Sequence, residues 1–390
     1  MPVSFQQVRV QIKEKGPAAV ARQKVLEERI EEALRLLHFH ADNLDGLRSI
    51  VERARAANNQ LRCAVPADER LTEVFSQCTE CPPVVVLAAD GSQVNPDRHS
   101  QVEFGVINTG AVRFAPGEAP REIVQTRLLM GEDLQLATGP MTEEYVALLR
   151  DLWERTLLAE LAAKESLPVV ALTDGQLELF RKPEATPDFD KRFTEYLEAL
   201  RGLGAVEAVT AGYVDKPKGD LVVRLLELTI VDPGDFDKIN RLRPLRWVPD
   251  AALFERLLGP GERSAVFKIQ SDSSDKFPGE LALHFFYINV SGDEKHPHLA
   301  RVEAPAWVAE HNVLLDRLHY ALVSQARVLG RRPYPYAIHR AHEVAVVRLE
   351  EKDQINDMIV RELRALGLPT GERSNKQVAK DNFGKRTRYP

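Results

Sequence analysis

Residues 84–92 have the sequence VVVLAADGS, and this stretch decides the fold. An apolar run rich in β-branched residues and closed by the turn residues Gly91 and Ser92 predicts a strand buried inside a sheet. Asp90 stands at the predicted end of that strand, where rigid backbone would hold its carboxylate. A divalent cation bound there could offset the cost of removing the charge from water.

The same pattern returns at residues 168–175, where PVVALT leads into Asp174 and Gly175. An Asp–Gly pair is also a common turn, and an Asp after a strand often caps a neighbouring element, so neither aspartate is decisive alone. Two aspartates on parallel patterns are the arrangement that a metal-dependent phosphodiesterase needs. We therefore expect Asp90 and Asp174 to share one cation site.

A third acidic group is expected on the helix that precedes Asp174. Glu154 is followed at helical spacing by Leu157, Leu158 and Leu161, which places it in the apolar stripe that faces the core. A buried carboxylate must be paired or metal-bound, so Glu154 is the better ligand candidate, although it could simply pair with Arg150. Glu160 is the alternative ligand; its position favours a solvent-exposed pair with the lysine at i+4.

The remaining pattern indicates an α/β protein with a sheet of mixed direction flanked by helices. Helix formers from residue 23 to 62, broken near residues 42–43, predict an N-terminal helical hairpin. Strands are expected at residues 102–107 and 111–114, divided by a turn at Asn108-Thr109-Gly110, and at 206–214. Helices are expected to run from Thr142 to about Glu165 and from Pro187 to Leu203.

The second half of the chain has a different character. Residues 218–304 are predicted to form a β-rich insertion, with strand-like runs at 221–231, 265–269, 281–290 and 300–302. One helix is expected at 306–329 and a helical stretch around His339 and His342. The expected organisation is a helical region at 1–80, a main domain at 81–350 that includes the insertion, and a C-terminal helix with a basic tail at 351–390.

Composition excludes several classes of protein. The 390 residues carry a formal net charge of −6, so any phosphate-binding surface must come from local clusters of the 52 Lys and Arg residues. No apolar run is long enough for a membrane span and no signal peptide is evident, so a cytoplasmic protein is expected. Cys78 and Cys81 have the spacing of half a zinc site, but no further ligand pair completes it, and free thiols are favoured.

At this point the chain resembles the NurA nuclease family, the partner nucleases of the hexameric HerA DNA translocase. The resemblance spans roughly residues 80 to 350 and rests on ADGS at 89–92, PDRH at 96–99, VINTG at 106–110, the helix with Glu154 before LTDG at 172–175, and Tyr334-Pro335 with Ala341-His342. The family is similar to RNase H-like folds, which suits the predicted order of strands and helices. Gln176 departs from the family, which often has Ser or Pro there.

The resemblance implies roles for particular residues. Asp90, Glu154 and Asp174 would be ligands of Mn²⁺ or Mg²⁺, which prefer oxygen donors. The family's spacing between its tyrosine and histidine selects Tyr334 and His342, rather than Tyr336 and His339. His342 would position water or protonate the leaving oxygen, and Tyr334 would orient the phosphate or stack on a base.

The implied function is that of a manganese-dependent 5′-to-3′ exonuclease with single-strand endonuclease activity. The resemblance also implies a homodimer that acts on DNA with a HerA-type hexameric ATPase in DNA end resection and double-strand break repair. Two alternatives remain open at this stage. The chain could be a catalytically inactive RNase H-like subunit that binds or clamps DNA for a translocase, or an enzyme that acts on small phosphoesters.

Overall fold

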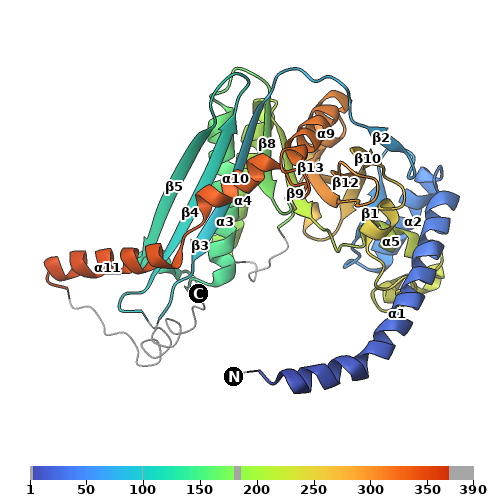
Figure 1. Ribbon diagram of the computed structural model, residues 1–390, viewed down its shortest axis with the longest axis horizontal. Coiled ribbons are helices and arrows are strands. Elements are labelled where there is room, and N and C mark those ends of the chain that lie inside the picture. Colours follow the sequence, from blue (N-terminus) through green and yellow to red (C-terminus); the bar gives the residue numbers. More distant parts are fainter. Residues whose placement is uncertain (1–2, 99, 180–185, 369–390) are drawn as a thin grey trace. The chain divides into compact units, whose positions relative to one another are not determined.

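The computed structural model describes residues 3–98, 100–179 and 186–368 (Figure 1). The chain divides into two compact units, each assembled from segments distant in sequence. The first unit comprises Met1–Glu80, Gly175–Glu178 and Ala211–Tyr334, and the second comprises Cys81–Asp174, Leu179–Thr210 and Pro335–Pro390. No helix among the described residues has both the length and the apolar character needed to cross a membrane.

The second unit is built on a mixed sheet whose strands lie in the order β8-β3-β4-β5. The first three strands along the chain form an antiparallel meander, and β8 then pairs in parallel with β3. Helix α3 leads into β8, as a crossover between parallel strands requires. This arrangement confirms the predicted mixed α/β sheet. The bounds are β3 (Val85–Val94), β4 (Phe104–Phe114), β5 (Arg121–Met130), α3 (Glu143–Ala162) and β8 (Val169–Asp174).

Two details of the meander correct the sequence-based prediction. Strand β3 does not end at Asp90, because Gly91 and Ser92 stay in the ladder opposite Thr109 and Asn108. Strand β4 likewise runs unbroken through the Asn108-Thr109-Gly110 segment that predicts a turn. Turn-forming residue types carry weight only as an average, and ladder pairing on both sides of β4 overrides them here.

The third strand of the meander is β5, which the sequence pattern misses. Six of its ten residues are exposed, and its charged side chains hide the strand pattern. The real turn lies at residues 115–120, which contain two prolines and a glycine. Charged, solvent-facing residues are typical of an edge strand and prevent it from pairing with other chains.

Four helices of the second unit cover its sheet. The helices predicted to start at Thr142 and at Pro187 are confirmed, since the Thr142 and Thr186 hydroxyls each cap a helix by accepting a backbone N–H. Helix α3 packs against both α4 and the sheet, and α10 lies across β3 and β4 (Figure 1). The bounds of the other helices are α4 (Pro187–Ala205), α10 (Tyr336–Ala345) and α11 (Leu349–Ala365), and a short β6 (Gln135–Leu136) pairs with β7 (Gly139–Pro140).

The first unit contains the helical hairpin and a second set of strands. The predicted break near residues 42–43 is confirmed between α1 (Phe5–Phe39) and α2 (Leu44–Ala57), although α1 begins well before residue 23. Its strands are β1 (Cys63–Pro66), β2 (Val74–Ser76), β9 (Val209–Asp215, in this unit from Ala211), β10 (Glu262–Ser264), β11 (Phe267–Gln270), β12 (Leu283–Asn289) and β13 (Leu299–Pro305). They pair antiparallel in the order β1-β11-β12-β13-β9.

The strand prediction for residues 221–231 is wrong, because this segment forms α5 (Leu221–Leu228). The helix is buried almost all round, and a short apolar run gives no periodicity that separates a buried helix from a buried strand. Asp250 caps it by accepting the N–H groups of Val222 and Val223. The helix expected at 306–329 is divided into α8 (Ala306–Ala309) and α9 (Asn312–Arg327); the remaining short helices are α6 (Ile239–Leu242) and α7 (Asp250–Phe254).

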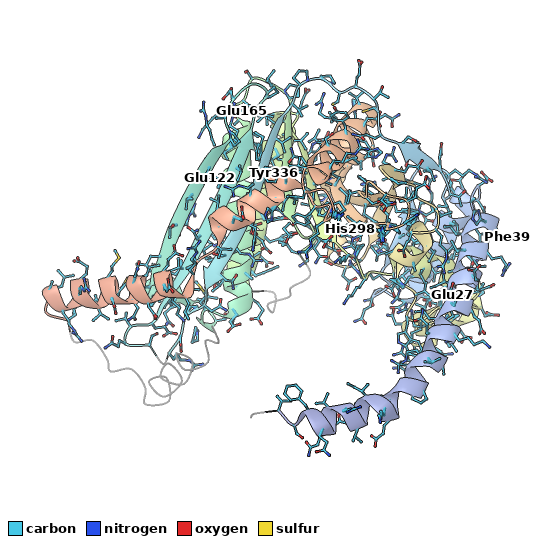
Figure 2. The ribbon with its side chains drawn as sticks, in the orientation of Figure 1. Glu27, Phe39, Glu122, Glu165, His298 and Tyr336 are labelled. Carbon is cyan, nitrogen blue, oxygen red and sulfur yellow. The ribbon has the colours of Figure 1, made fainter. Side chains whose placement is uncertain are left out.

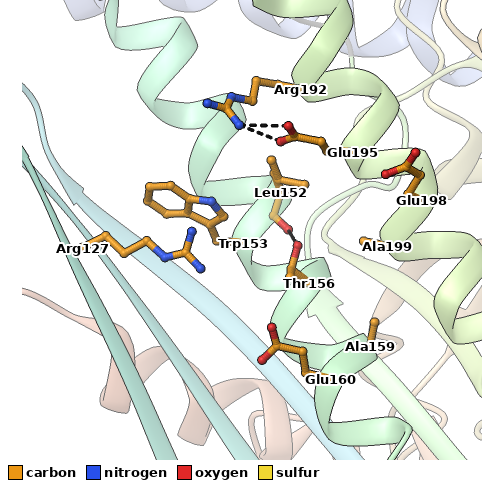
Figure 3. Close-up of a pocket in the computed structure, with 10 residues that line it drawn as sticks. All are labelled: Arg127, Leu152, Trp153, Thr156, Ala159, Glu160, Arg192, Glu195, Glu198 and Ala199. Carbon is orange, nitrogen blue, oxygen red and sulfur yellow. Dashed lines mark hydrogen bonds and ion pairs between the residues drawn. The ribbon is translucent and has the colours of Figure 1, made fainter. Parts of the chain in front are cut away.

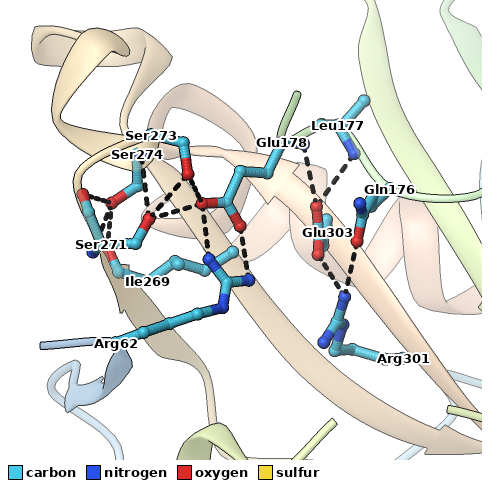
Figure 4. Close-up of polar contacts among 10 residues, drawn as sticks. All are labelled: Arg62, Gln176, Leu177, Glu178, Ile269, Ser271, Ser273, Ser274, Arg301 and Glu303. Carbon is cyan, nitrogen blue, oxygen red and sulfur yellow. Dashed lines mark hydrogen bonds and ion pairs between the residues drawn. The ribbon is translucent and has the colours of Figure 1, made fainter. Parts of the chain in front are cut away.

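A polar network in the first unit holds residues 175–178, the segment that follows β8 (Figure 4). Arg62 forms two hydrogen bonds of 2.7 and 2.6 Å with the buried Glu178 carboxylate. Burial alone would raise the pKa of Glu178, but the bonds from Arg62 and from Ser271 outweigh it and lower the pKa. Glu303 accepts the N–H groups of Leu177 and Glu178 at 2.9 and 3.2 Å. The backbone after Asp174 is therefore fixed by buried carboxylates.

Candidate catalytic site in the second unit

Asp90 and His342 lie in direct contact. Asp90 is in the middle of β3 with its side chain 16% exposed, and its Oδ2 lies 2.7 Å from Nδ1 of His342 on α10. The other carboxylate oxygen accepts the N–H of Gly91 at 2.9 Å. His342 is 64% exposed, so its remaining ring nitrogen faces solvent. The pair thus joins a largely buried carboxylate on the sheet to an exposed imidazole on α10.

Helix α10 can pack close to Asp90 because a glycine, which has no side chain, lies beneath it on β4. Gly110 is the ladder partner of Asp90 on β4, and a Cβ atom on Gly110 would lie 2.6 Å from the backbone nitrogen of Ala345. That separation is far below a van der Waals contact, so only glycine allows the helix to pack this closely. Gly110 therefore sets the height of α10, and with it of His342, above the sheet.

Two polar side chains fix the end of α10 on the strands. Ser92 Oγ and Asn108 Nδ2 donate to the Ala345 carbonyl at 2.6 and 2.8 Å, and Ser92 Oγ accepts the N–H of Val347 at 3.0 Å. Asn108 is held in turn by the hydroxyl of Thr126 at 2.6 Å. Sequence reasoning misses the roles of Ser92 and Asn108, because they become apparent only when β3 and β4 are paired.

Two further contacts keep α10 against β4 and β5. Arg340 forms an ion pair with Glu122 on β5, and the Tyr336 ring packs 5.6 Å from Phe114 at the end of β4. Glu122 and Tyr336 are labelled in Figure 2. The helix is therefore anchored along its whole length.

Asp174 ends β8, the strand beside β3. In the parallel register, Ala89 of β3 lies beside Thr173 of β8. Asp90 and Asp174 are the residues that follow these two, so they stand at the same level on neighbouring strands. Asp174 is exposed, whereas Thr173 before it is buried. The sheet thus brings the two predicted aspartates together at one level of adjacent strands.

Glu154 reaches β3 from α3, on the face of the sheet opposite to α10. It is only 5% exposed, as its predicted position on the core-facing stripe requires. A Cβ atom on Gly91 would lie 2.8 Å from Glu154 Oε1 and 2.4 Å from Cγ of Arg150, so α3 side chains occupy the space that a Gly91 side chain would need. Because side chains alternate along a strand, Gly91 faces α3 while Asp90 faces α10.

Two arginines flank the Glu154 carboxylate. Arg150 and Arg155 each lie 3.5 Å from it, so the pair with Arg150 that the sequence allows is present. Burial raises the pKa of Glu154 well above its usual range; the carboxylates of Asp151 and Asp90 raise it further, and the two arginines only partly oppose this. Asp151 escapes sequence reasoning, although its spacing of three from Glu154 on one helix was an available signal.

Tyr334 belongs to the first unit, in which its ring packs edge-on against Tyr213 with centroids 5.4 Å apart. Its proposed role beside the carboxylates therefore stays a prediction. His339, the residue set aside in favour of His342, is partly exposed and lies 3.6 Å from Glu343.

Comparison with known proteins identifies the family. A model of the NurA domain matches residues 84–347, which include every predicted acidic ligand, Tyr334 and His342. The chain belongs to the NurA family. This confirms the family resemblance, and membership of this nuclease family makes nuclease the activity class of the chain.

Among solved structures, the NurA nuclease from Sulfolobus solfataricus is similar with a TM-score of 0.55 and 11% identity, covering 92% of this chain and 97% of that one. The catalytic domain of human Endonuclease V matches with a TM-score of 0.31 and 17% identity, covering 76% of this chain and 92% of that chain. A Ciona intestinalis Endonuclease V in complex with DNA matches with a TM-score of 0.30 and 14% identity, covering 78% of this chain and 96% of that chain. No curated protein matched in sequence.

The acidic groups of this NurA domain suit a hard divalent cation in kind. Asp90, Asp174 and Glu154 offer only carboxylate oxygens, the donors that Mn²⁺ and Mg²⁺ favour. Within residues 3–98, 100–179 and 186–368, no three His, Cys, Asp or Glu side chains are gathered closely enough to hold a metal ion as they lie. Glu154 lies beside Gly91 on the α3 side of β3, 3.5 Å from each of Arg150 and Arg155, whereas Asp90 contacts His342 on α10.

The alternative third ligand, Glu160, lies on another part of α3. It is exposed and lines a cavity of about 400 Å³ between α3 and α4, shown in Figure 3. The same cavity contains Trp153, with the Arg127 guanidinium 4.1 Å above its ring, and the ion pair between Arg192 and Glu195. Glu154 lies beside Gly91 of β3, whereas Glu160 lines this cavity.

Proposed function

We propose that this NurA-family chain is a DNA nuclease that depends on a divalent cation and hydrolyses phosphodiester bonds at Asp90, Asp174 and Glu154. The observation that carries the proposal is the contact between Asp90 and His342, next to Asp174 on the neighbouring strand. An acid, a second acid and an exposed imidazole at one place are the groups that phosphodiester hydrolysis uses.

The acidic residues would hold the cation. Asp90 and Asp174 are held rigidly because both lie in paired strands. Glu154, whose carboxylate occupies the space beside Gly91 of β3, would be the third ligand. Mn²⁺ or Mg²⁺, when bound, lowers the pKa of a water molecule and offsets the negative charge that develops on the phosphate. Glu154 would have to leave Arg150 and Arg155, and the length of those two contacts supports that exchange.

His342 would move the proton. If its Nδ1–H donates to Asp90, the opposite ring nitrogen is free to take a proton from the attacking water or to deliver one to the leaving oxygen. Asp90 orients the ring for either step. Ser92, Asn108 and Gly110 act indirectly, since they place the helix that carries His342.

Family membership also supports proposals about the type of cleavage, the preferred metal ion and the partner. We propose 5′-to-3′ exonuclease and single-strand endonuclease activity with Mn²⁺ as the preferred ion. We also propose that the chain works as a homodimer with a HerA-type hexameric ATPase in DNA end resection and double-strand break repair. Tyr334 is proposed to orient the phosphate or stack on a base.

The test is cleavage of end-labelled single-stranded DNA by the purified full-length chain with Mn²⁺, with Mg²⁺ and with EDTA. Asp90→Asn and Asp174→Asn should abolish cutting, and His342→Ala should reduce it by roughly 10²–10⁴-fold, the usual worth of a general acid or base. Labels at either end distinguish exonuclease polarity from internal cuts.

A second candidate is a non-catalytic subunit that binds or clamps DNA. Two observations favour it: the Glu154 carboxylate lies against two arginines, and the described residues gather no group of three possible metal ligands. This candidate predicts DNA binding with no Mn²⁺-dependent cutting by the wild-type chain. Equal residual cutting by the wild type and Asp90→Asn would rule out the catalytic proposal in its favour.

A further inference from the structure

Trp247, in the first unit, adopts a backbone conformation that large residues avoid. Its φ is +77°, in the left-handed region, and its side chain is 55% exposed. A bulky non-glycine residue there is strained, and such strain persists only where the surrounding structure imposes it. Tryptophan is also normally well buried. Neither backbone preference nor core packing therefore explains why this residue points into solvent.

The strain is imposed by anchors on both sides of Trp247. Leu245 and Val248 are buried, and the N–H of Leu245 donates to the buried Glu227 carboxylate at 2.9 Å. Arg243 pairs with the same carboxylate at 2.7 Å, and the N–H of Val248 donates back to the Leu245 carbonyl at 3.2 Å. With the loop fixed at these points, Trp247 and the residue before it are turned outward.

Three arginines surround the exposed ring. The guanidinium carbons of Arg22, Arg29 and Arg246 lie 5.8, 5.2 and 5.3 Å from the ring centroid. Arg29 also donates to the Arg246 carbonyl at 2.9 Å, which ties α1 to the loop. Throughout the part of the chain that the structure describes, none of the three forms an ion pair with a carboxylate. Three positive charges are thus gathered around one aromatic side chain, with no described carboxylate within ion-pair distance of them.

We infer that Trp247 with Arg22, Arg29 and Arg246 is a binding site for single-stranded DNA. Unpaired bases stack on exposed aromatic rings and on guanidinium planes, and guanidinium groups also bind phosphate oxygens. Duplex DNA keeps its base faces stacked within the helix and cannot offer one to the ring. An acidic protein segment would satisfy the arginines but would leave the strained, outward-facing tryptophan unexplained.

The site lies in the first unit, whereas the catalytic carboxylates belong to the second. The inference rests on the proposed function only for the identity of the ligand as DNA. It adds a second point at which this chain would hold a strand, by contacts that do not involve the cation. Binding through Trp247 should therefore persist when the cation is removed.

The experiment measures binding of fluorescein-labelled oligo(dT) 20-mer to the full-length chain in EDTA by fluorescence anisotropy. Trp247→Ala should weaken binding roughly 5- to 150-fold, the range that loss of one base–aromatic stack produces. The double variant Arg22→Gln with Arg246→Gln should lower the slope of log affinity against log salt by about 1.4, or about 0.7 per lost phosphate contact. Arg9→Gln, an exposed position on the same helix α1, is the matched control and should bind like wild type.

Trp247→Gly separates loss of binding from loss of folding. Glycine tolerates φ +77°, so this variant should melt no lower than wild type while binding oligo(dT) as weakly as Trp247→Ala. Wild-type affinity in Trp247→Ala would overturn the inference. So would an equal loss of binding to polyglutamate and oligo(dT), which would indicate an acidic protein partner. A wild-type chain that binds oligo(dT) through Trp247 but never cuts it would contradict the proposed nuclease and leave this site intact.

Discussion

At the scale of single residues, Glu154 is the group on which the catalytic proposal depends most. Its carboxylate is buried, its pKa is raised by burial and by the neighbouring acids, and its two arginine contacts are long. A carboxyl group in this position is costly for the fold unless a positive charge is provided. A role in holding a cation would explain why an acid and not an amide occupies the position.

Replacing Glu154 or Glu160, which lie on the same helix, by glutamine tests which of them is the third ligand. Glu154→Gln should reduce Mn²⁺-dependent cutting by roughly 100-fold or more, because it removes a charged oxygen ligand at nearly constant shape. Glu160→Gln should stay within a few-fold of wild type, since Glu160 lines the cavity beside Trp153. Initial cutting rates at saturating Mn²⁺ give both values. The reverse result would move the third ligand to Glu160.

His319 should make the protein sensitive to mild acid. It is 1% exposed, contacts the Gly261 carbonyl through Nε2 at 2.8 Å, and burial lowers its pKa from 6.5 to about 4. Above pH 6.5 the ring is neutral in both folded and unfolded chains. Below that pH the unfolded chain takes up a proton that the folded chain resists, so stability falls between pH 6.5 and 4.

The loss of unfolding free energy due to His319 should approach roughly 3 kcal/mol at pH 4, as a pKa shift of this size implies. His319→Gln can keep the hydrogen bond to the carbonyl but carries no titrating group, so its stability should fall less over the same pH range. Urea unfolding of both chains at pH 7.5 and 5 measures the difference. Parallel pH profiles would show that His319 is not the responsible group.

At the scale of elements, the site depends on how closely α10 packs on β4. Gly110→Ala would place a methyl group 2.6 Å from the Ala345 nitrogen, and backbone cannot yield as a flexible side chain can. We expect the free energy of unfolding to fall by roughly 1–3 kcal/mol, as is typical of overpacking, which lowers the melting temperature. The cutting rate should also fall, because His342 moves away from Asp90. Both follow from one displacement.

The control for this substitution is Gly202→Ala in α4. There the nearest atom would be the Ala159 Cβ at 3.6 Å, an ordinary contact, and alanine favours helix more than glycine does. Gly202→Ala should therefore melt at the same or a higher temperature and cut normally. If Gly110→Ala behaves like Gly202→Ala, close packing of α10 does not control the site.

The same element shows what sequence could and could not predict. The buried strand before Asp90, its repeat before Asp174 and the apolar stripe with Glu154 depend on local patterns, and each predicted element exists in the structure. Ser92, Asn108 and Gly110 act only through strand pairing and helix docking, contacts between segments far apart in sequence. No local pattern encodes them, and Asn108-Thr109-Gly110 predicts a turn when taken alone.

At the scale of the whole molecule, the net charge of −6 hides local organisation. The arginines around Trp247 form a positive cluster in the first unit, while Asp90, Asp151 and Glu154 lie near one another, with Arg150 and Arg155, in the second. A strand of DNA needs positive charge where it is held, and a cation where it is cut. Under the two proposals, the chain holds the strand in one unit and cuts it in the other.

Hydrogen exchange can detect cation binding and strand binding separately in one molecule. Mn²⁺ without DNA should slow amide exchange in peptides covering β3 and β8, because a bound ion stabilises the strands that carry its ligands, by about 2.7 kcal/mol at 100 times the dissociation constant. Oligo(dT) in EDTA should instead slow exchange around residues 243–250 and leave β3 unchanged. Asp90→Asn should lose only the first response and Trp247→Ala only the second. Loss of both responses in either variant would mean that cation and strand bind at one site.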